Sequence, residues 1–483
     1  MAMLIDKIDH LVVLMMENRS FDNLAGYLYK DKPLPLHFEP STNKTPYQGL
    51  STGGPYWNPM NASYYSGQPA QPIYVKEGAS GPTVPDPDPG EYFDDMNYQL
   101  FGAVGVTHPA KYPMSGFYLN YKNQKSKPTA PEQIMQCFSS HQVPAMSLLA
   151  RSYAISDAWH ASTPNQTWPN RAFAALGTSL GKVNNWPYDP YHYDVKTIFN
   201  TLENTGHTWN VYNDSDAMSL TRLQFPKLYD LFLEGHFHGF KKFQKDAANG
   251  NLPQYSFVEP RFIGHEANDM HPPHNVPLGD KYIYEITKAV MLGKKAKNTL
   301  LIITFDEHGG CYDHLMPPFG AVTPGPESNP GEEGFTFNRF GVRIPTLFIS
   351  PLIKPSTVFR SPTDVPYDHT SILASLQEWL KLPTSEMPVS ARTQNAPTFW
   401  NVLNNPSADT NFTSLSEYEA GETDEMKIKA PSVKPGGPAN DLQLSMVVAA
   451  ASAEKGSSLT ADELKELCSK NWTRKAVEDY LKK

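Results

Sequence analysis

Two apolar runs of the sequence end in residues that could bind a metal ion. The run IDHLVVLMM is followed by Glu17 and Asn18, and the run NTLLIITF is followed by Asp306 and Glu307. Near-continuous apolar runs of this length are typical of strands buried on both faces of a parallel sheet, and ligands bind beyond the carboxyl ends of such strands. Carboxylate and amide oxygens favour a divalent cation, with Ca²⁺, Mg²⁺ or Mn²⁺ preferred and Zn²⁺ possible. The alternative interpretation is that Glu17 and Asp306 cap helices or pair with arginines.

A second polar cluster lies in the stretch HEANDMHPPHN. It contains His265, Asp269, His271 and His274, and two adjacent prolines stiffen the loop. A single histidine in a loop is usually a surface residue, but two histidines and an aspartate at this spacing more often serve a ligand or a metal. His369 is a further candidate, and the alternative for it is a place beside the cap of the next helix.

Thr167 and Arg171 lie in the stretch TWPNR, at the predicted start of a helix. A hydroxyl just ahead of a helix N-terminus lies where backbone N–H groups point toward an anion. An arginine one turn later could bind two phosphate oxygens at once. The alternative is that Thr167 simply caps the helix.

Strands and helices alternate along most of the chain. This alternation predicts an α/β fold with a doubly wound, mostly parallel sheet and helices on both of its faces. The predicted strands lie at 8–16, 153–158, 208–212, 256–258, 298–305 and 344–350. The predicted helices lie at 144–151, 171–180, 195–204, 282–292 and 370–382.

A long segment at 29–131 interrupts this alternation. It is rich in Pro and Tyr, and the whole chain has 44 Pro in 483 residues, against about 5% in average proteins. Its Tyr and Trp are uncommon in disordered segments, so we expect an ordered, loop-rich insertion over the active site.

One catalytic domain is predicted over 1–403, followed by a linker at 404–440. A small helical C-terminal extension is predicted at 441–483, because Thr460 and Glu463 form a capping box ahead of an amphipathic helix. No residue of this extension has an evident catalytic role in the sequence.

Composition excludes several classes of protein. The chain has 41 Lys+Arg against 50 Asp+Glu, a formal charge of −9, which argues against nucleic-acid binding. Its three cysteines are too few for a disulfide framework or a four-thiolate zinc site. No apolar stretch is long enough for a transmembrane segment. The start of the chain lacks the pattern of a signal peptide, so we expect a cytoplasmic protein, or a secreted or periplasmic one if a leader was removed.

These motifs together resemble the bacterial phosphoesterase family of non-specific phospholipases C and respiratory-burst-inhibiting acid phosphatases. The resemblance covers residues 8–383, and ENRSFD and TFDEHGGCYDH are its most specific stretches. The other matching stretches are TWPNRAF, LPQYSFVEPRF, NDMHPPHNV, RFGVRIPTLFISP and YDHTSIL.

The resemblance implies a fold similar to that of alkaline phosphatase, with a metal-assisted site at one edge of the sheet. It implies that Glu17, Asn18, Asp306 and Glu307 are metal ligands, and that Thr167 is both a ligand and the nucleophile.

The resemblance also assigns residues that would act on the phosphate and the leaving group. His271 matches the active-site histidine of the family, and His274 and His369 are weaker candidates. Related sequences often carry a histidine in the first insertion where this chain has Glu91. That replacement puts a carboxylate near the leaving group and leaves the general acid and the pH optimum open.

Three functions remain for the chain. The first is a phospholipase C that hydrolyses phosphatidylcholine-type diesters through a covalent phosphothreonine. The second is a broad acid phosphatase acting on small phosphoesters, and the third is a non-catalytic binding protein on the same scaffold. The sequence does not determine the metal, the headgroup or the oligomeric state.

Overall fold

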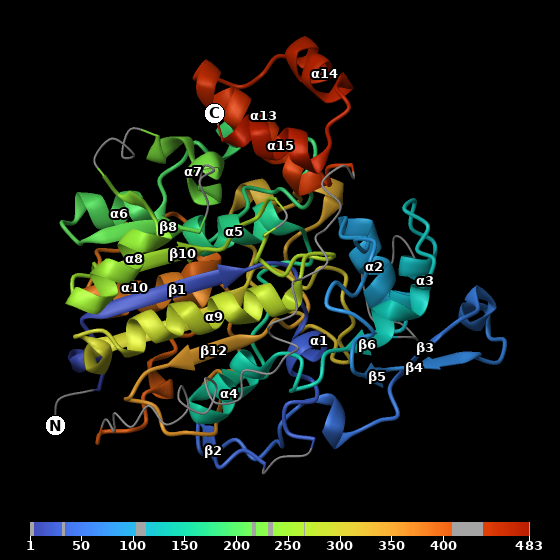
Figure 1. The fold of residues 1–483 in the computed structure, drawn as a ribbon, viewed down its shortest axis with the longest axis horizontal. Coiled ribbons are helices and arrows are strands. Elements are labelled where there is room, and N and C mark those ends of the chain that lie inside the picture. The colour runs from blue at the N-terminus through green and yellow to red at the C-terminus, as the bar shows by residue number, and fades with distance from the viewer. Residues whose placement is uncertain are drawn as a thin grey trace.

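The computed structural model describes residues 4–30, 34–102, 113–214, 219–229, 235–264, 266–407 and 438–482. A nine-stranded sheet runs through its centre, with helices on both faces (Figure 1). In spatial order the strands are β2 (His37–Glu39), β13 (Thr357–Phe359), β7 (Ala154–Ser156), β12 (Thr346–Ile349), β11 (Thr299–Phe305), β1 (His10–Met16), β10 (Tyr255–Glu259), β8 (Trp209–Asn213) and β9 (Phe237–Gly239). The predicted fold class is confirmed.

The sheet is parallel except at β12, which runs antiparallel to both β11 and β7. The strand predicted at 344–350 therefore exists in shortened form, but its direction was not evident from its apolar sequence. At the centre, β1 pairs in parallel with β10 and β11, and Met16 lies opposite Phe305. The residues that follow, Glu17 and Asp306, consequently leave the sheet side by side at the same edge.

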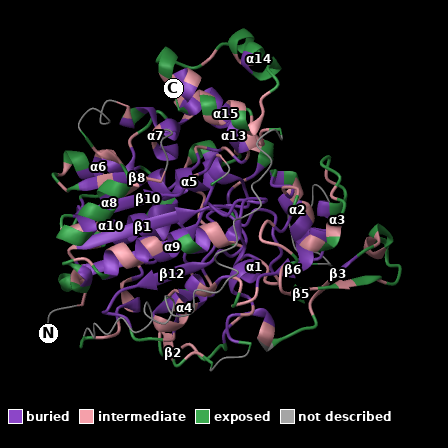
Figure 2. Cartoon of the chain, viewed as in Figure 1, coloured by how far each residue is buried: buried purple, intermediate pink, exposed green. Residues whose placement is uncertain are grey.

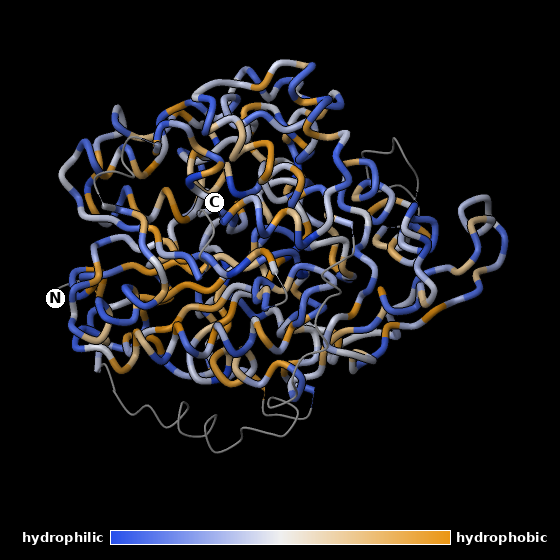
Figure 3. The backbone as a smooth tube through the Cα atoms, turned by 45° about the horizontal axis from the view of Figure 1, so that its top comes forward, coloured by the Kyte–Doolittle hydropathy of each residue, from blue (hydrophilic) through white to orange (hydrophobic). Residues whose placement is uncertain are grey.

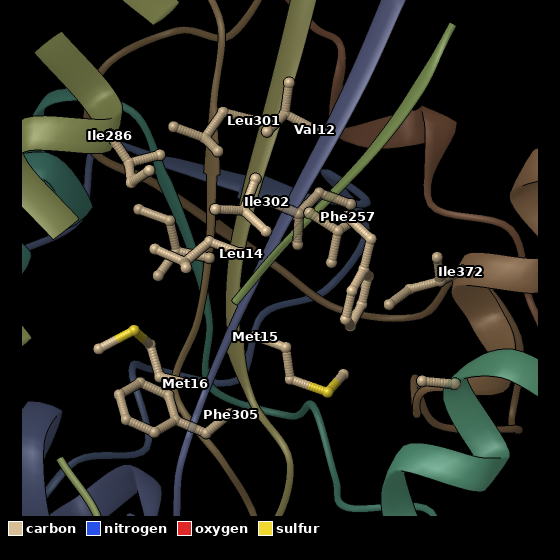
Figure 4. Packing of buried hydrophobic residues seen from close by; sticks show 14 of the residues in the cluster. Val12, Leu14, Met15, Met16, Phe257, Ile286, Leu301, Ile302, Phe305 and Ile372 are labelled. Atoms are coloured by element: carbon tan, nitrogen blue, oxygen red, sulfur yellow. The ribbon is translucent and has the colours of Figure 1, made fainter. Parts of the chain in front are cut away.

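The core lies around β1, in which all seven residues are buried. Ile286 of α9 (Val276–Met291) and Ile372 of α10 (Thr370–Leu380) pack toward the central strands from different helices (Figure 4). Apolar residues gather along the sheet, and its central strands are buried, whereas the edge strands β2 and β9 are partly exposed (Figures 2 and 3). No helix in the described ranges is both long and apolar enough to cross a bilayer.

The predicted helices are present but differ from the prediction at their ends, and two of them differ most. The helix predicted at 171–180 is α5 (Thr167–Leu176), and it ends earlier because Gly177 adopts a left-handed conformation with φ +76°. The helix predicted at 282–292 begins earlier, because the Asn275 side chain caps the N-terminus of α9. The other helices before the C-terminal extension and outside the insertion are α1 (Phe21–Ala25), α4 (Pro144–Ser152), α6 (Ile198–Asn204), α7 (Leu220–Gln224), α8 (Phe240–Asn249) and α11 (Ala391–Asn395).

The described part of the segment predicted as an insertion forms short strands and helices (Figure 1). They pack around a small apolar cluster to which Tyr312 and Val342 also contribute. The elements of the segment are the paired strands β3 (Trp57–Pro59) and β4 (Pro72–Tyr74), the strand β5 (Lys76–Glu77), which pairs with β6 (Gln136–Cys137), and the helices α2 (Phe93–Phe101) and α3 (Phe117–Lys122).

The C-terminal extension forms three helices, α13 (Asp441–Lys455), α14 (Ala461–Ser469) and α15 (Arg474–Leu481). The predicted capping box at Thr460 and Glu463 is present. The extension packs onto the rest of the chain, since the Trp168 indole donates a 2.6 Å hydrogen bond to the Ser445 hydroxyl of α13. Most of the predicted linker lies outside the described residues.

Candidate active site

The site is organised around Asn18, which follows β1. Its backbone N–H donates to Asp306 Oδ1 at 3.0 Å. Its side-chain amide donates to Glu307 Oε1 at 2.6 Å and to Glu91 Oε1 at 2.9 Å. Asn18 has φ +51°, a left-handed conformation that asparagine tolerates better than most residues. This turn brings three carboxylates, from two distant segments of the chain, to one asparagine.

Gly309 allows this close approach. A Cβ atom at Gly309 would lie 2.2 Å from the Asn18 carbonyl oxygen, and its φ of +60° also favours glycine. The Gly-Gly turn after Asp306 and Glu307 is therefore needed for the chain to pass Asn18.

Thr167 is the first residue of α5, and its hydroxyl points toward the end of β1. Its Oγ1 lies 3.3 Å from Glu17 Oε2 and 3.4 Å from Asn18 Oδ1. The N-cap residue of α5 is Gln166, so the alternative that Thr167 caps the helix is wrong. The hydroxyl of Thr167 thus joins the cluster of oxygens that follows the strands.

Arg171 lies one turn further along α5 and forms a buried ion pair with Glu17. Its Nε and Nη2 both donate to Glu17 Oε1, at 2.9 Å and 2.6 Å. The alternative that Glu17 pairs with an arginine is therefore correct. Arg171 Nη1 has no hydrogen-bond partner among the described residues, so one arm of the guanidinium remains for a bound anion.

The buried carboxylates repel one another. Burial and the neighbouring Asp306 raise the pKa of Glu17 well above its ordinary value, and Arg171 opposes this shift. Burial and then Glu91 raise the pKa of Glu307 in the same way. Asp306 Oδ2 has no hydrogen-bond partner in the part of the chain that the structure describes. Arg171 Nε lies 3.8 Å from this oxygen. A divalent cation beside Asp306 Oδ2 would offset the repulsion, and carboxylate and amide oxygens are suitable ligands for it. Glu17, Asp306 and Glu307 are not among the groups of described residues whose ligand atoms already lie close enough together to hold one ion.

A second cluster of ionisable groups adjoins the first through Glu91. His271 Nε2 lies 3.7 Å from Glu91 Oε2, and His271 Nδ1 lies 3.7 Å from Asp88 Oδ1. Burial raises the pKa of Glu91 to about 8, although the hydrogen bond from Asn18 lowers it. Glu91, Asp88 and His271 are close enough together to hold a metal ion. Asp88 was missed as a candidate, although it lies three residues before Glu91 in the same Pro-rich stretch.

His274 and His369 position other residues. His274 Nδ1 donates to Asp269 Oδ1 at 2.7 Å, and the Asp269 carbonyl accepts the backbone N–H of Glu17. His369 Nε2 donates to the backbone carbonyl of Asp306 at 2.6 Å. Burial lowers the pKa of His369. His265 lies outside the described residues.

A separate group of Asp22, Asp313 and His314 is also compact enough for a metal ion. Arg343 lies within it and donates to both carboxylates, at 3.0 to 3.2 Å. Since the arginine already neutralises these acids, this group is a buried ion-pair network.

A cavity of about 90 Å³ opens beside Glu91 and His271. Its wall is acidic, since Asp88 and Asp95 of the insertion and Asp441 at the start of α13 all line it. Tyr92 also lines it and donates a hydrogen bond to the Asp441 carboxylate. The C-terminal extension, in which the sequence showed no chemistry, therefore forms part of the wall of the site.

The fold and this site define a class of protein. The model of the family described as the Phosphoesterase family matches residues 8–383, and the chain belongs to this family. It is a phosphoric ester hydrolase, as the resemblance of its motifs predicted.

Two proteins with similar sequences are named as phospholipases C. The chain is 34% identical over 387 residues to "Non-specific phospholipase C6" of Arabidopsis thaliana, covering 78% of this chain and 68% of the relative. It is 27% identical over 423 residues to "Phospholipase C B" of Mycobacterium tuberculosis, covering 79% and 74%. A solved structure of an alkaline phosphatase superfamily protein from Vibrio parahaemolyticus is similar with a TM-score of 0.33 and 14% identity, covering 53% of this chain and 64% of that one.

Proposed function

We propose that the chain is a metal-dependent phospholipase C that cleaves phosphatidylcholine-type diesters through a phosphothreonine at Thr167. The observation that carries this proposal is the position of the Thr167 hydroxyl, 3.3 Å from Glu17 and 3.4 Å from Asn18. A hydroxyl is a weak nucleophile unless a base or a metal activates it. Residues 1–403 form the proposed catalytic domain.

A divalent cation held by Glu17, Asn18, Asp306 and Glu307 would polarise the phosphate oxygens and lower the pKa of the Thr167 hydroxyl. Thr167 Oγ1 loses its proton as it bonds to phosphorus, and Glu17 Oε2 is an acceptor within hydrogen-bond distance. The free arm of Arg171 stabilises the charge on the equatorial phosphate oxygens.

The leaving group is the oxygen of diacylglycerol, which takes up a proton as its bond to phosphorus breaks. His271 and Glu91 adjoin the cavity and are the proposed donors. Water then cleaves the threonine ester, releases the phosphorylated headgroup and restores the Thr167 hydroxyl.

The acidic wall of the cavity supports a diester with a cationic headgroup over a small monoester. Asp95 and Asp441 repel the second negative charge of a phosphomonoester but attract the quaternary ammonium of a choline headgroup. Burial raises the pKa of Asp88 well above its ordinary value, so the argument rests on the other two carboxylates. Tyr92 in the same wall adds a ring that can contact such a cation. An acid phosphatase that acts on small monoesters would need a more basic pocket, and the residues that line this cavity include no Lys or Arg.

Two substrates and two variants test the proposal. The protein should release diacylglycerol from phosphatidylcholine, whereas release of inorganic phosphate from p-nitrophenyl phosphate alone would favour the acid phosphatase. Thr167→Ala should lower turnover by at least about 10³-fold with unchanged metal content and melting temperature, and Thr167→Ser should retain measurable turnover. An unchanged kcat in Thr167→Ala would remove Thr167 from the mechanism. No turnover of either substrate by the metal-loaded wild type would favour the non-catalytic alternative.

A further inference from the structure

The β3–β4 hairpin of the insertion stands away from the rest of the chain, as Figures 1 and 3 both show. We propose that this 57–74 hairpin docks the enzyme on the headgroup layer of a neutral, zwitterionic lipid bilayer. This inference rests on the proposed function, because a phospholipase C must meet its substrate at a membrane surface.

The composition of the hairpin is unusual for an exposed segment. Residues 45–75 contain no Asp, Glu, Lys, Arg or His, although charged residues make up 19% of the chain. The same stretch contains five Tyr and one Trp. Tyr and Trp favour the interface between water and lipid, because an apolar ring there can keep its polar group hydrated.

The hairpin presents apolar and aromatic side chains to solvent. Tyr74 is 53% exposed and Met60 is 39% exposed, and most residues of the hairpin are exposed or of intermediate burial, coloured green or pink in Figure 2. Trp57 lies opposite Tyr74 in the strand pair and contacts Tyr64 edge-on, with ring centroids 5.7 Å apart. These side chains form a mixed aromatic and apolar surface.

The base of the hairpin is fixed, so its direction relative to the site is defined. Asn58 is buried and donates to the Met114 carbonyl at 3.0 Å, while its side-chain oxygen accepts the Tyr118 N–H at 3.1 Å. Tyr65 packs on the last turn of α2, with its ring 6.2 Å from that of Tyr98.

The helix α2 connects the hairpin to the cavity. Asp95 in the first turn of α2 lines the cavity, while Gly102 after its last turn lies against Tyr65. A helix of this length spans roughly 13 Å. A bilayer that contacts the hairpin is therefore close to the cavity where the headgroup would bind.

Charge decides between types of membrane. The chain carries a net charge of −9 and the hairpin offers no cation, so an anionic bilayer would repel the protein and gain nothing from the hairpin. A neutral bilayer avoids this repulsion and still accepts the aromatic rings.

The test uses the double variant Met60→Ser/Tyr74→Ser of the full chain. Its matched control is Leu292→Ser/Val389→Ser, which removes two other exposed apolar side chains, 60% and 90% exposed. Flotation with phosphatidylcholine vesicles measures binding, and hydrolysis of a monomeric short-chain phosphatidylcholine measures the catalytic site alone. We expect roughly tenfold weaker vesicle binding in the hairpin variant, wild-type binding in the control, and unchanged hydrolysis of the monomeric substrate in both.

Vesicle binding of the hairpin variant equal to that of the wild type overturns the inference and indicates that the hairpin faces another partner, such as a protein. Equal losses in the hairpin variant and the control also overturn it, as does failure of the wild type to bind vesicles while it hydrolyses the monomeric diester. Vesicle binding that depends on the hairpin, in a protein that hydrolyses no diester, supports the inference and refutes the proposed function instead.

Discussion

Replacement of Arg171 by methionine tests whether a cation shares the charge of Glu17. Arg171 donates two hydrogen bonds to Glu17 Oε1, at 2.9 Å and 2.6 Å, and both side chains are buried. Removal of one partner of a buried ion pair costs about 3–5 kcal/mol, because the other charge remains uncompensated. Unfolding entropy of about 2.1 cal/mol/K per residue gives about 0.8 kcal/mol/K for a domain of roughly 400 residues. The expected fall in melting temperature is therefore about 4–6 °C.

The measurement is thermal unfolding in EDTA and again with saturating Mg²⁺, Ca²⁺ or Mn²⁺. In EDTA, Glu17 of the Arg171→Met variant has lost its main compensating charge, and the full fall in melting temperature should appear. With the cation bound near Glu17, the loss should shrink by half or more, because the ion provides positive charge in place of the guanidinium.

The control is Arg360→Met, which breaks a buried pair of similar geometry. Arg360 donates to both carboxylate oxygens of Asp157, each at 2.7 Å. The fall in melting temperature of Arg360→Met should be the same with and without the cation. The reasoning about a shared charge would be refuted if the fall in melting temperature of Arg171→Met were also the same with and without the cation. A fall smaller than about 1 °C would refute it as well.

Three further predictions concern stability. Ser445→Ala should cost about 1–3 kcal/mol, because the Trp168 indole N–H that donates to this hydroxyl is left buried without a partner; urea unfolding measures it. Asp280→Ala should cost a similar amount, since this carboxylate accepts two backbone N–H groups at the start of α4, at 2.8 Å and 2.9 Å; Asp280→Asn should lose less. Burial lowers the pKa of His160 to about 3, against about 6.5 in an unfolded chain. Between these values only the unfolded chain binds the proton, so stability should fall as the pH falls from about 6.5 toward 3, and His160→Asn should reduce that slope.

Each of these has a contrary outcome. Ser445→Ala unfolding at the wild-type urea concentration would show that the extension contributes nothing through this bond. A loss in Asp280→Asn as large as in Asp280→Ala would mean that the charge, rather than an acceptor oxygen, stabilises α4. An identical pH dependence in His160→Asn and the wild type would assign the acid sensitivity to other groups.

Local patterns were sufficient to predict the central strands and the polar residues that follow them. The apolar runs before Glu17 and Asp306 could form only strands or a buried helix segment, and their length favoured strands. A parallel sheet was expected from the α/β alternation, but the pairing that places Met16 opposite Phe305 came from the structure. Thr167 could be predicted near them only through the resemblance of its motif, since its own surroundings fitted a helix cap equally well.

Other features depend on contacts between distant segments. The reversed direction of β12 could not be read, because an apolar strand buried on both faces has the same sequence in either orientation. The ion pair between Arg171 and Glu17 joins residues 154 positions apart. No local pattern identifies the two as partners. The wall that Asp441 adds to the cavity depends on how the C-terminal helices pack, and their surface residues carry no pattern that encodes it.

The sequence by itself therefore determined the class of fold, the family and the residues able to carry the chemistry, because hydrophobic periodicity and short motifs are local properties of a chain. Only the tertiary structure decided which of those residues meet. It joined Glu91 to Asn18 and His271, placed an acidic wall around the cavity and extended an uncharged hairpin into solvent. The physical reason is that burial, shared charge and exposure belong to the arrangement of segments in space, and no single segment encodes them.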